Sequence, residues 1–158
     1  MKASVTWKGN MVFTGETNSG FPVLLDSDSV VGGTNSGPRP MEMIALGLAG
    51  CTAMDVISIL KKKRLKVTSF NVHVDAPRSS DHPKVFTSAV VTYVVSGKDI
   101  DEVAVLRAIE LSTTKYCPAI AMLGQSFPID HQYEIYEDEG DGQQRLTYQG
   151  SWQEMIVE

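Results

Sequence analysis

The segment from Gly37 to Arg64 constrains the fold of this chain more than any other. It is a long run of apolar and small residues without the polar face of a surface helix. Pro40 near its start and the cations Lys61 to Arg64 at its end suit the two ends of a helix dipole. The pattern predicts a helix of about 24 residues, roughly 36 Å long, that is buried on all sides. Since a chain of 158 residues has difficulty enclosing such a helix, we expect a partner subunit to cover it.

The same segment is close to the length that a bilayer-spanning helix needs. Asp55 lies in its middle, however, where a carboxylate is costly inside a membrane. No second hydrophobic segment of this length follows, and the flanking sequence has the alternating patterns of a soluble domain. The segment is therefore interpreted as a buried core helix, and no membrane association is expected.

The overall charge also narrows the classes of partner. The net charge of −5 argues against nucleic-acid binding, which requires clustered Lys and Arg side chains. The single basic run, Lys61 to Arg64, is explained as the end of the long helix. The first residues lack the apolar core of a signal peptide, so a cytoplasmic location is the default expectation.

The rest of the chain predicts one α+β domain over residues 1–158. The first 26 residues alternate as a three-stranded antiparallel meander, and a Gly- and Ser-rich loop leads to the long helix at Pro40. The later elements are predicted as strands 67–76 and 84–96, helices 99–116 and 118–124, and strand 127–138. Residues 138–158 are predicted to be either an edge strand or a peripheral tail.

Cys117 is the more reactive of the two cysteines by its local sequence. Pro118 breaks the preceding helix and suits the first turn of the next, which places Cys117 near a helix N-cap. A thiol at a helix N-terminus has a lowered pKa, and Lys115 adds positive charge nearby. The alternative is a small core residue at a helix junction.

Cys51 lies in the middle of the apolar helix, where packing is the simpler explanation from the residues alone. Burial there raises a thiol pKa, and Asp55 one turn on raises it further if it faces the same way. His73, His82 and His131 are scattered, and no CxxC or HxxxH pattern occurs in the sequence. We therefore expect neither a metal site nor a bound cofactor.

Two motifs resemble the OsmC/Ohr family. One is GGTNSGPRPMEMIALGLAGCTAMDVISIL around Cys51, and the other is YCPAIAML around Cys117. The resemblance covers roughly residues 1 to 137, and its details are similar to a divergent YhfA-like branch. It implies an OsmC-like α+β fold, in which antiparallel sheets wrap around long central helices in an intertwined homodimer.

The resemblance also implies a thiol-dependent peroxidase that reduces organic hydroperoxides and, in some members, hydrogen peroxide. Cys51 would then be the peroxidatic thiolate and Cys117 the resolving cysteine, which reverses the order of reactivity expected from the local sequence. A Cys51 sulfenic acid would condense with Cys117 to a disulfide. A dithiol or lipoyl-type reductant would restore both thiols without any bound cofactor.

The sequence departs from the family pattern at the groups that hold the thiolate. Family peroxidases use an Arg from the N-terminal hairpin and a Glu at the start of the central helix. Residues 9–26 contain no Arg, and Met41 stands where the Glu is expected, with Glu42 about 100° further around the helix. Arg39 and Glu42 are therefore the candidate replacements. The alternative function is a non-catalytic stress-response protein that binds a small apolar ligand or senses redox state.

Overall fold

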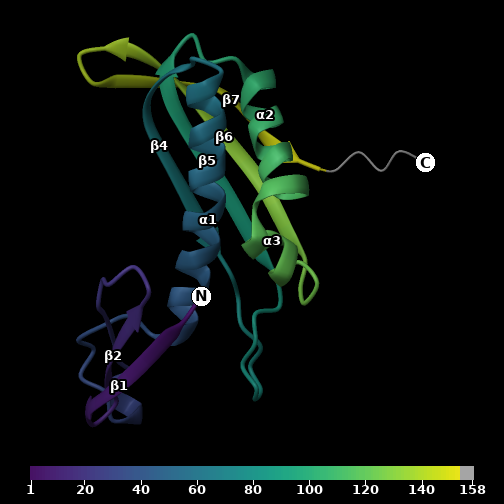
Figure 1. Ribbon diagram of the computed structural model, residues 1–158. Coiled ribbons are helices and arrows are strands. Elements are labelled where there is room, and N and C mark those ends of the chain that lie inside the picture. Colours follow the sequence, from purple (N-terminus) through teal and green to yellow (C-terminus); the bar gives the residue numbers. More distant parts are fainter. Residues whose placement is uncertain (154–158) are drawn as a thin grey trace. The chain divides into compact units, whose positions relative to one another are not determined.

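The computed structural model describes residues 1–153 and contains two compact units, the first Met1–Leu46 and the second beginning at Gly47 (Figure 1). The boundary falls inside helix α1 (Pro40–Lys62), so this helix supplies its first residues to one unit and the remainder to the other. The long helix therefore begins and ends within two residues of its predicted bounds.

The first unit contains the predicted meander. Strands β1 (Ala3–Gly9), β2 (Val12–Thr17) and β3 (Val23–Leu25) pair antiparallel in the order β1-β2-β3. The β1–β2 turn uses Gly9 and Asn10, both with positive φ, a conformation that glycine and asparagine adopt most readily. The loop between β3 and α1 contains one short 3₁₀ helix, η1 (Ser29–Val31).

Asp26 organises the loop between β3 and α1. Its carboxylate is only 2% exposed and accepts hydrogen bonds from the backbone amides of Ser27, Thr34 and Ser36. The hydroxyls of Thr34 and Ser36 also donate to it. These bonds hold the pKa of Asp26 far below its usual value, and the bond from the Ser36 amide has the largest effect. The long loop is therefore closed around a fixed negative charge.

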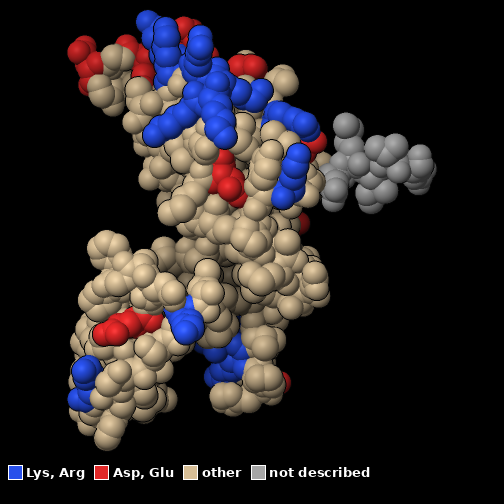
Figure 2. All heavy atoms as spheres, viewed as in Figure 1, with Lys and Arg blue, Asp and Glu red and all other residues tan. Residues whose placement is uncertain are grey.

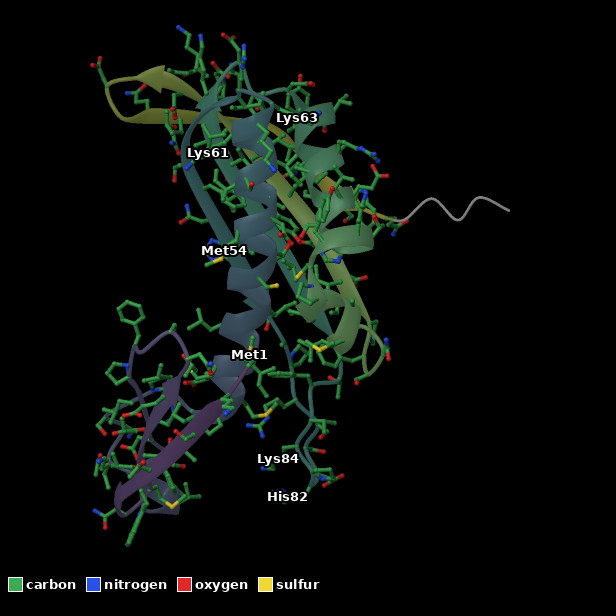
Figure 3. All side chains as sticks on the ribbon, viewed as in Figure 1. Met1, Met54, Lys61, Lys63, His82 and Lys84 are labelled. Carbon is green, nitrogen blue, oxygen red and sulfur yellow. The ribbon has the colours of Figure 1, made fainter. Side chains whose placement is uncertain are left out.

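In the second unit α1 packs through one stripe of side chains. The buried positions recur every four residues and are Leu48, Thr52, Val56 and Leu60. Within residues 1–153 the other sides are half-buried or exposed, and Met54, 74% exposed, projects outward (Figure 3). The expectation of a helix buried on all sides is therefore wrong for the single chain. By length and composition α1 would also suit a membrane span, but its buried stripe belongs to the core of a folded unit.

The second unit is built on a four-stranded sheet in the order β4-β5-β6-β7. Its strands are β4 (Lys66–Asp75), β5 (Ala89–Lys98), β6 (Ile129–Gly140) and β7 (Gln143–Trp152). β5 and β6 pair parallel, because helix α2 (Glu102–Leu111), π-helix η2 (Ser112–Tyr116) and helix α3 (Pro118–Leu123) return the chain between them. The sheet is therefore mixed. Our expectation of wholly antiparallel sheets is wrong at the β5–β6 pair.

Strand β7 is the edge strand that was one of two predictions for residues 138–158, and positions 154–158 lie outside the described residues. Figure 1 shows α1, α2 and α3 on one side of the sheet. The core forms between them from residues of α1, β5, β6 and α2, including Val56, Leu60, Val95, Ile109 and Ile135. Lys and Arg side chains gather where α1 ends, as expected for the negative end of a helix dipole (Figure 2).

Candidate functional site

The two cysteines meet in the second unit. Cys51 is half-buried on α1, and Cys117 is 3% exposed at the N-cap of α3. Both are free thiols, and they lie close enough that Cys51 helps to raise the pKa of Cys117. The structure therefore brings together the two residues that the sequence predicts as the reactive pair.

The π-helix η2 sets the position of Cys117. The Cys117 amide donates to the Ser112 carbonyl at 2.9 Å, a bond that spans five residues rather than four. Pro118 then occupies the first turn of α3, and the Cys117 sulfur accepts from the Ile120 amide at 3.5 Å. The predicted N-cap position of Cys117 is therefore confirmed.

The predicted acidity of Cys117 is wrong. Burial raises the pKa of Cys117 to about 12, and the hydrogen bond and charge of Cys51 act in the same direction. The amides of Ile120 and Ala119 lower this pKa, but by less than burial raises it. Cys117 is therefore a neutral thiol near pH 7, which suits the second of two thiols to react rather than the first.

A buried hydroxyl cluster, Thr52, Tyr93 and Ser112, connects the segments that carry the cysteines. The Thr52 hydroxyl is 2.7 Å from the Tyr93 hydroxyl and 2.9 Å from the Ser112 hydroxyl, and all three residues are fully buried. Thr52 follows Cys51 on α1, and the Ser112 carbonyl accepts a hydrogen bond from the Cys117 amide. Thr52 and Ser112 therefore tie the two cysteine-bearing segments together. Sequence reasoning missed them, although Thr52 lies on the buried stripe of α1.

His131 extends this cluster and was also missed. Its Nδ1 lies 3.3 Å from the Tyr93 hydroxyl, and burial lowers the pKa of His131 to about 4 despite the nearby Asp130 charge. The alternation of Ile129, His131 and Tyr133 along β6 is the signal that places it on the core face. Within residues 1–153, no three His, Cys, Asp or Glu side chains are grouped so as to hold a metal ion.

Arg39 and Glu42 pair with each other in the first unit. The Arg39 amide donates to Glu42 at 2.9 Å, so Glu42 acts as the carboxylate of a capping box at the start of α1. The Arg39 guanidinium donates to Glu42 at 3.3 Å, to Asp28 at 3.0 Å and to Asn35 at 2.8 Å. The role of Arg39 and Glu42 at Cys51 stays a prediction.

Comparisons with known proteins agree on the family. A family model described as OsmC-like protein matches residues 33–132. Over 135 residues the chain is 38% identical to protein YhfA of Escherichia coli K12. The alignment covers 85% of this chain and 98% of YhfA.

Two solved structures extend the comparison to the fold. A hypothetical protein from Aquifex aeolicus VF5 has 28% identity and a TM-score of 0.76, over 87% of this chain and 97% of that one. An organic hydroperoxide resistance protein from Elizabethkingia anophelis has a TM-score of 0.61 at 14% identity, over 86% of this chain and 94% of that one. At that identity the likeness is one of fold.

Proposed function

This chain belongs to the OsmC-like family, and we propose that it is a thiol-dependent peroxidase that reduces organic hydroperoxides, with hydrogen peroxide as a second substrate. The observation that carries the proposal is the proximity of two free cysteines from separate elements, Cys51 on α1 and Cys117 at the N-cap of α3. The shared fold with an organic hydroperoxide resistance protein supports the choice of substrate class.

In the proposed reaction the Cys51 thiolate attacks one peroxide oxygen and the O–O bond breaks. The products are a Cys51 sulfenic acid and an alkoxide, which takes up a proton. Cys117 then attacks the Cys51 sulfur, and a disulfide and water form. A raised pKa suits Cys117 to this second role, because a neutral thiol does not compete for peroxide. A dithiol or lipoyl-type reductant completes the cycle in the cytoplasm, where thiols stay reduced.

The proposal is tested by the reduction of cumene hydroperoxide with dithiothreitol as electron donor. Cys51→Ser is expected to abolish turnover. Cys117→Ser is expected to stop at the sulfenic acid, which dimedone traps on Cys51. Absence of turnover in the wild type, with both thiols still reduced after peroxide, would contradict the proposal.

We also propose that a second copy of the chain covers the free side of α1. Met54 is largely exposed there, and a Cβ on Gly50 would meet no described atom within 4 Å apart from its chain neighbours and the backbone of its own helix. Small residues of this kind let two helices approach closely. Light scattering after gel filtration is expected to give twice the chain mass, and Gly50→Glu is expected to give the monomer. A monomeric wild type would contradict the proposal.

A non-catalytic role is the second candidate, as a stress-response protein that binds a small apolar ligand or senses redox state. The observation that favours it is the engagement of Arg39, the candidate activating cation, by Asp28, Asn35 and Glu42. A sensor would form one disulfide per chain on oxidation and show no repeated turnover with dithiothreitol. A binding protein would keep both thiols reduced and retain an apolar ligand after purification.

A further inference from the structure

A continuous line of hydrogen bonds passes through the buried hydroxyl cluster and ends on a titratable group at each side. At one end Ser112 donates to the Asp55 carboxylate at 3.2 Å. The Ser112, Thr52 and Tyr93 hydroxyls follow in sequence, and Tyr93 is bonded to His131 Nδ1 at the other end. Four elements therefore supply one line of five side chains, from α1, η2, β5 and β6.

The direction of all four bonds follows from the acceptor at one end. An ionised carboxylate only accepts, and each hydroxyl has a single hydrogen to donate. Because Ser112 uses its hydrogen on Asp55, Thr52 must donate to Ser112, and Tyr93 must donate to Thr52. The remaining bond must then run from His131 Nδ1–H to the Tyr93 oxygen. The line is polarised from His131 to Asp55.

The two ends have different surroundings. His131 lines a pocket of about 360 Å³, together with residues that include Thr113, Thr114, Asp130 and Trp152. Asp55 is half-buried and lies four residues after Cys51 on α1, which places both side chains on one helix face. One end therefore borders a pocket that water can enter, and the other borders the cysteine proposed to react with peroxide.

We propose that these five side chains form a proton relay from the pocket at His131 to Asp55, which protonates the alkoxide released at Cys51. The inference rests on the proposed peroxidase function and adds to it the source of the proton. As the Cys51 sulfur bonds to the peroxide oxygen, the O–O electron pair leaves with the alkoxide, which takes up a proton that the relay delivers through the Asp55 carboxylate.

The Asp55 carboxylate receives that proton by one shift along each of the four hydrogen bonds and passes it to the alkoxide. Ser112 passes its hydrogen to Asp55, Thr52 to Ser112, Tyr93 to Thr52, and His131 Nδ1 to Tyr93. Pocket water supplies a proton to His131 Nε2. Sulfur loses two electrons and the peroxide gains them, so no further reactant is needed for this step.

Burial keeps the imidazole and the phenol of the line neutral at rest. Burial outweighs the Asp130 charge at His131, so the imidazole is neutral near pH 7. At Tyr93, burial raises the pKa first of all, and the charges of Cys117 and Asp55 raise it further. Tyr93 therefore keeps its hydrogen until a proton arrives from His131.

Oxidants with different leaving groups separate a relay from a packing effect. The alkoxide of tert-butyl hydroperoxide needs a proton, whereas the carboxylate of peracetic acid leaves without one. In single-turnover oxidation of Cys51, Tyr93→Phe is expected to slow tert-butyl hydroperoxide by about 100-fold, a typical general-acid contribution. The reaction with peracetic acid is expected to keep its rate. Equal slowing with both oxidants, or no slowing with either, would overturn the relay.

Matched variants and one spectroscopic test complete the design. Tyr133→Phe is the control, because Tyr133 is the register neighbour of Tyr93 but donates to Glu102 outside the line. Thr52→Ser is expected to retain the selective rate and Thr52→Val to lose it. A wild type inert to both oxidants would overturn the peroxidase itself. Nitrogen-15 spectra test the direction independently of activity, since an Nε2–H tautomer of His131 would overturn the relay whatever the enzyme does.

Discussion

The loop around Asp26 and the cluster around Thr52 bury polar groups in opposite ways. In the first unit a single negative charge is surrounded by backbone amides and two hydroxyls that all donate to it. In the second unit neutral hydroxyls alternate as donor and acceptor, next to an imidazole that burial keeps neutral. The first arrangement fixes the shape of a loop. The second holds helices to a sheet through hydroxyls that each donate and accept.

Each unit also carries its own fluorescent reporter. Trp7 lies on β1 of the first unit, and Trp152 lies on β7 of the second, 5.8 Å from His131 between ring centroids. Removal of one tryptophan at a time therefore allows the two polar arrangements to be compared in the same protein.

The largest effect is expected from the titration of His131. The pKa of a free histidine is about 6.5, and that of His131 is about 4, so between these values the unfolded chain binds more protons. Stability of the second unit should therefore fall as pH is lowered from 6.5 to 4, by up to about 3 kcal/mol, and stay level above 6.5. Urea unfolding followed by Trp152 in a Trp7→Phe background measures this. If His131→Asn loses as much stability on acidification as the wild type, the prediction is wrong.

The next effect is expected from Thr52→Val. Valine keeps the shape but leaves the Tyr93 and Ser112 hydroxyls each without one fully buried partner. We expect a loss of about 1–3 kcal/mol in the free energy of unfolding, the cost of burying unpaired polar groups. Thr52→Ser, which keeps the hydroxyl, should cost less. Equal losses in the two variants would show that the methyl group of Thr52, not its hydroxyl, matters.

A local effect is expected from Asp26→Asn. The amide that replaces one carboxylate oxygen cannot accept, so the amides of Thr34 and Ser36 lose their charged acceptor. Hydrogen exchange at these amides should speed up by at least about tenfold, while exchange in β5 stays unchanged. Because the pKa of Asp26 is far lower in the folded protein, acidification should weaken the wild-type loop progressively from about pH 4 downward. Unchanged exchange would contradict the role given to Asp26.

The smallest effect is expected from Arg39→Ala. Its guanidinium pairs with Asp28 and Glu42 at an exposed position, where ion pairs contribute little to stability. The thermal midpoint followed by Trp7 should therefore stay within the scatter of replicate measurements. Glu42→Ala should cost more, because it also removes the acceptor of the amide at the start of α1. A larger loss for Arg39→Ala than for Glu42→Ala would reverse this ranking.

Local sequence signals predicted the elements well. The meander, the extent of α1, the N-cap at Cys117 and the predicted strand 127–138 all depend on alternation, proline and dipole rules that act over a few residues. The parallel pairing of β5 with β6 does not depend on such local rules. It is decided by where the three intervening helical segments return the chain.

The chemistry of the site was predicted less completely, for the same reason. The N-cap of Cys117 is a local property, whereas its pKa is raised by burial in the packed core and by its neighbour Cys51. Likewise, the alternation along β6 marks His131 as inward-facing, but only the pairing of β5 with β6 brings it to Tyr93. Family resemblance, rather than local sequence, gave the order of the two thiols' roles that we propose to test.

The π-helix before Cys117 makes the number of residues between Ser112 and Cys117 a requirement of the site. A bond spanning five residues, from the Cys117 amide to the Ser112 carbonyl, accommodates one residue more than an α-helical turn does. Deletion of a single residue between them would restore an ordinary turn and rotate the thiol by about 100°. Relatives that differ by an insertion or deletion in this segment would therefore have lost the meeting of the two sulfurs, even with both cysteines retained.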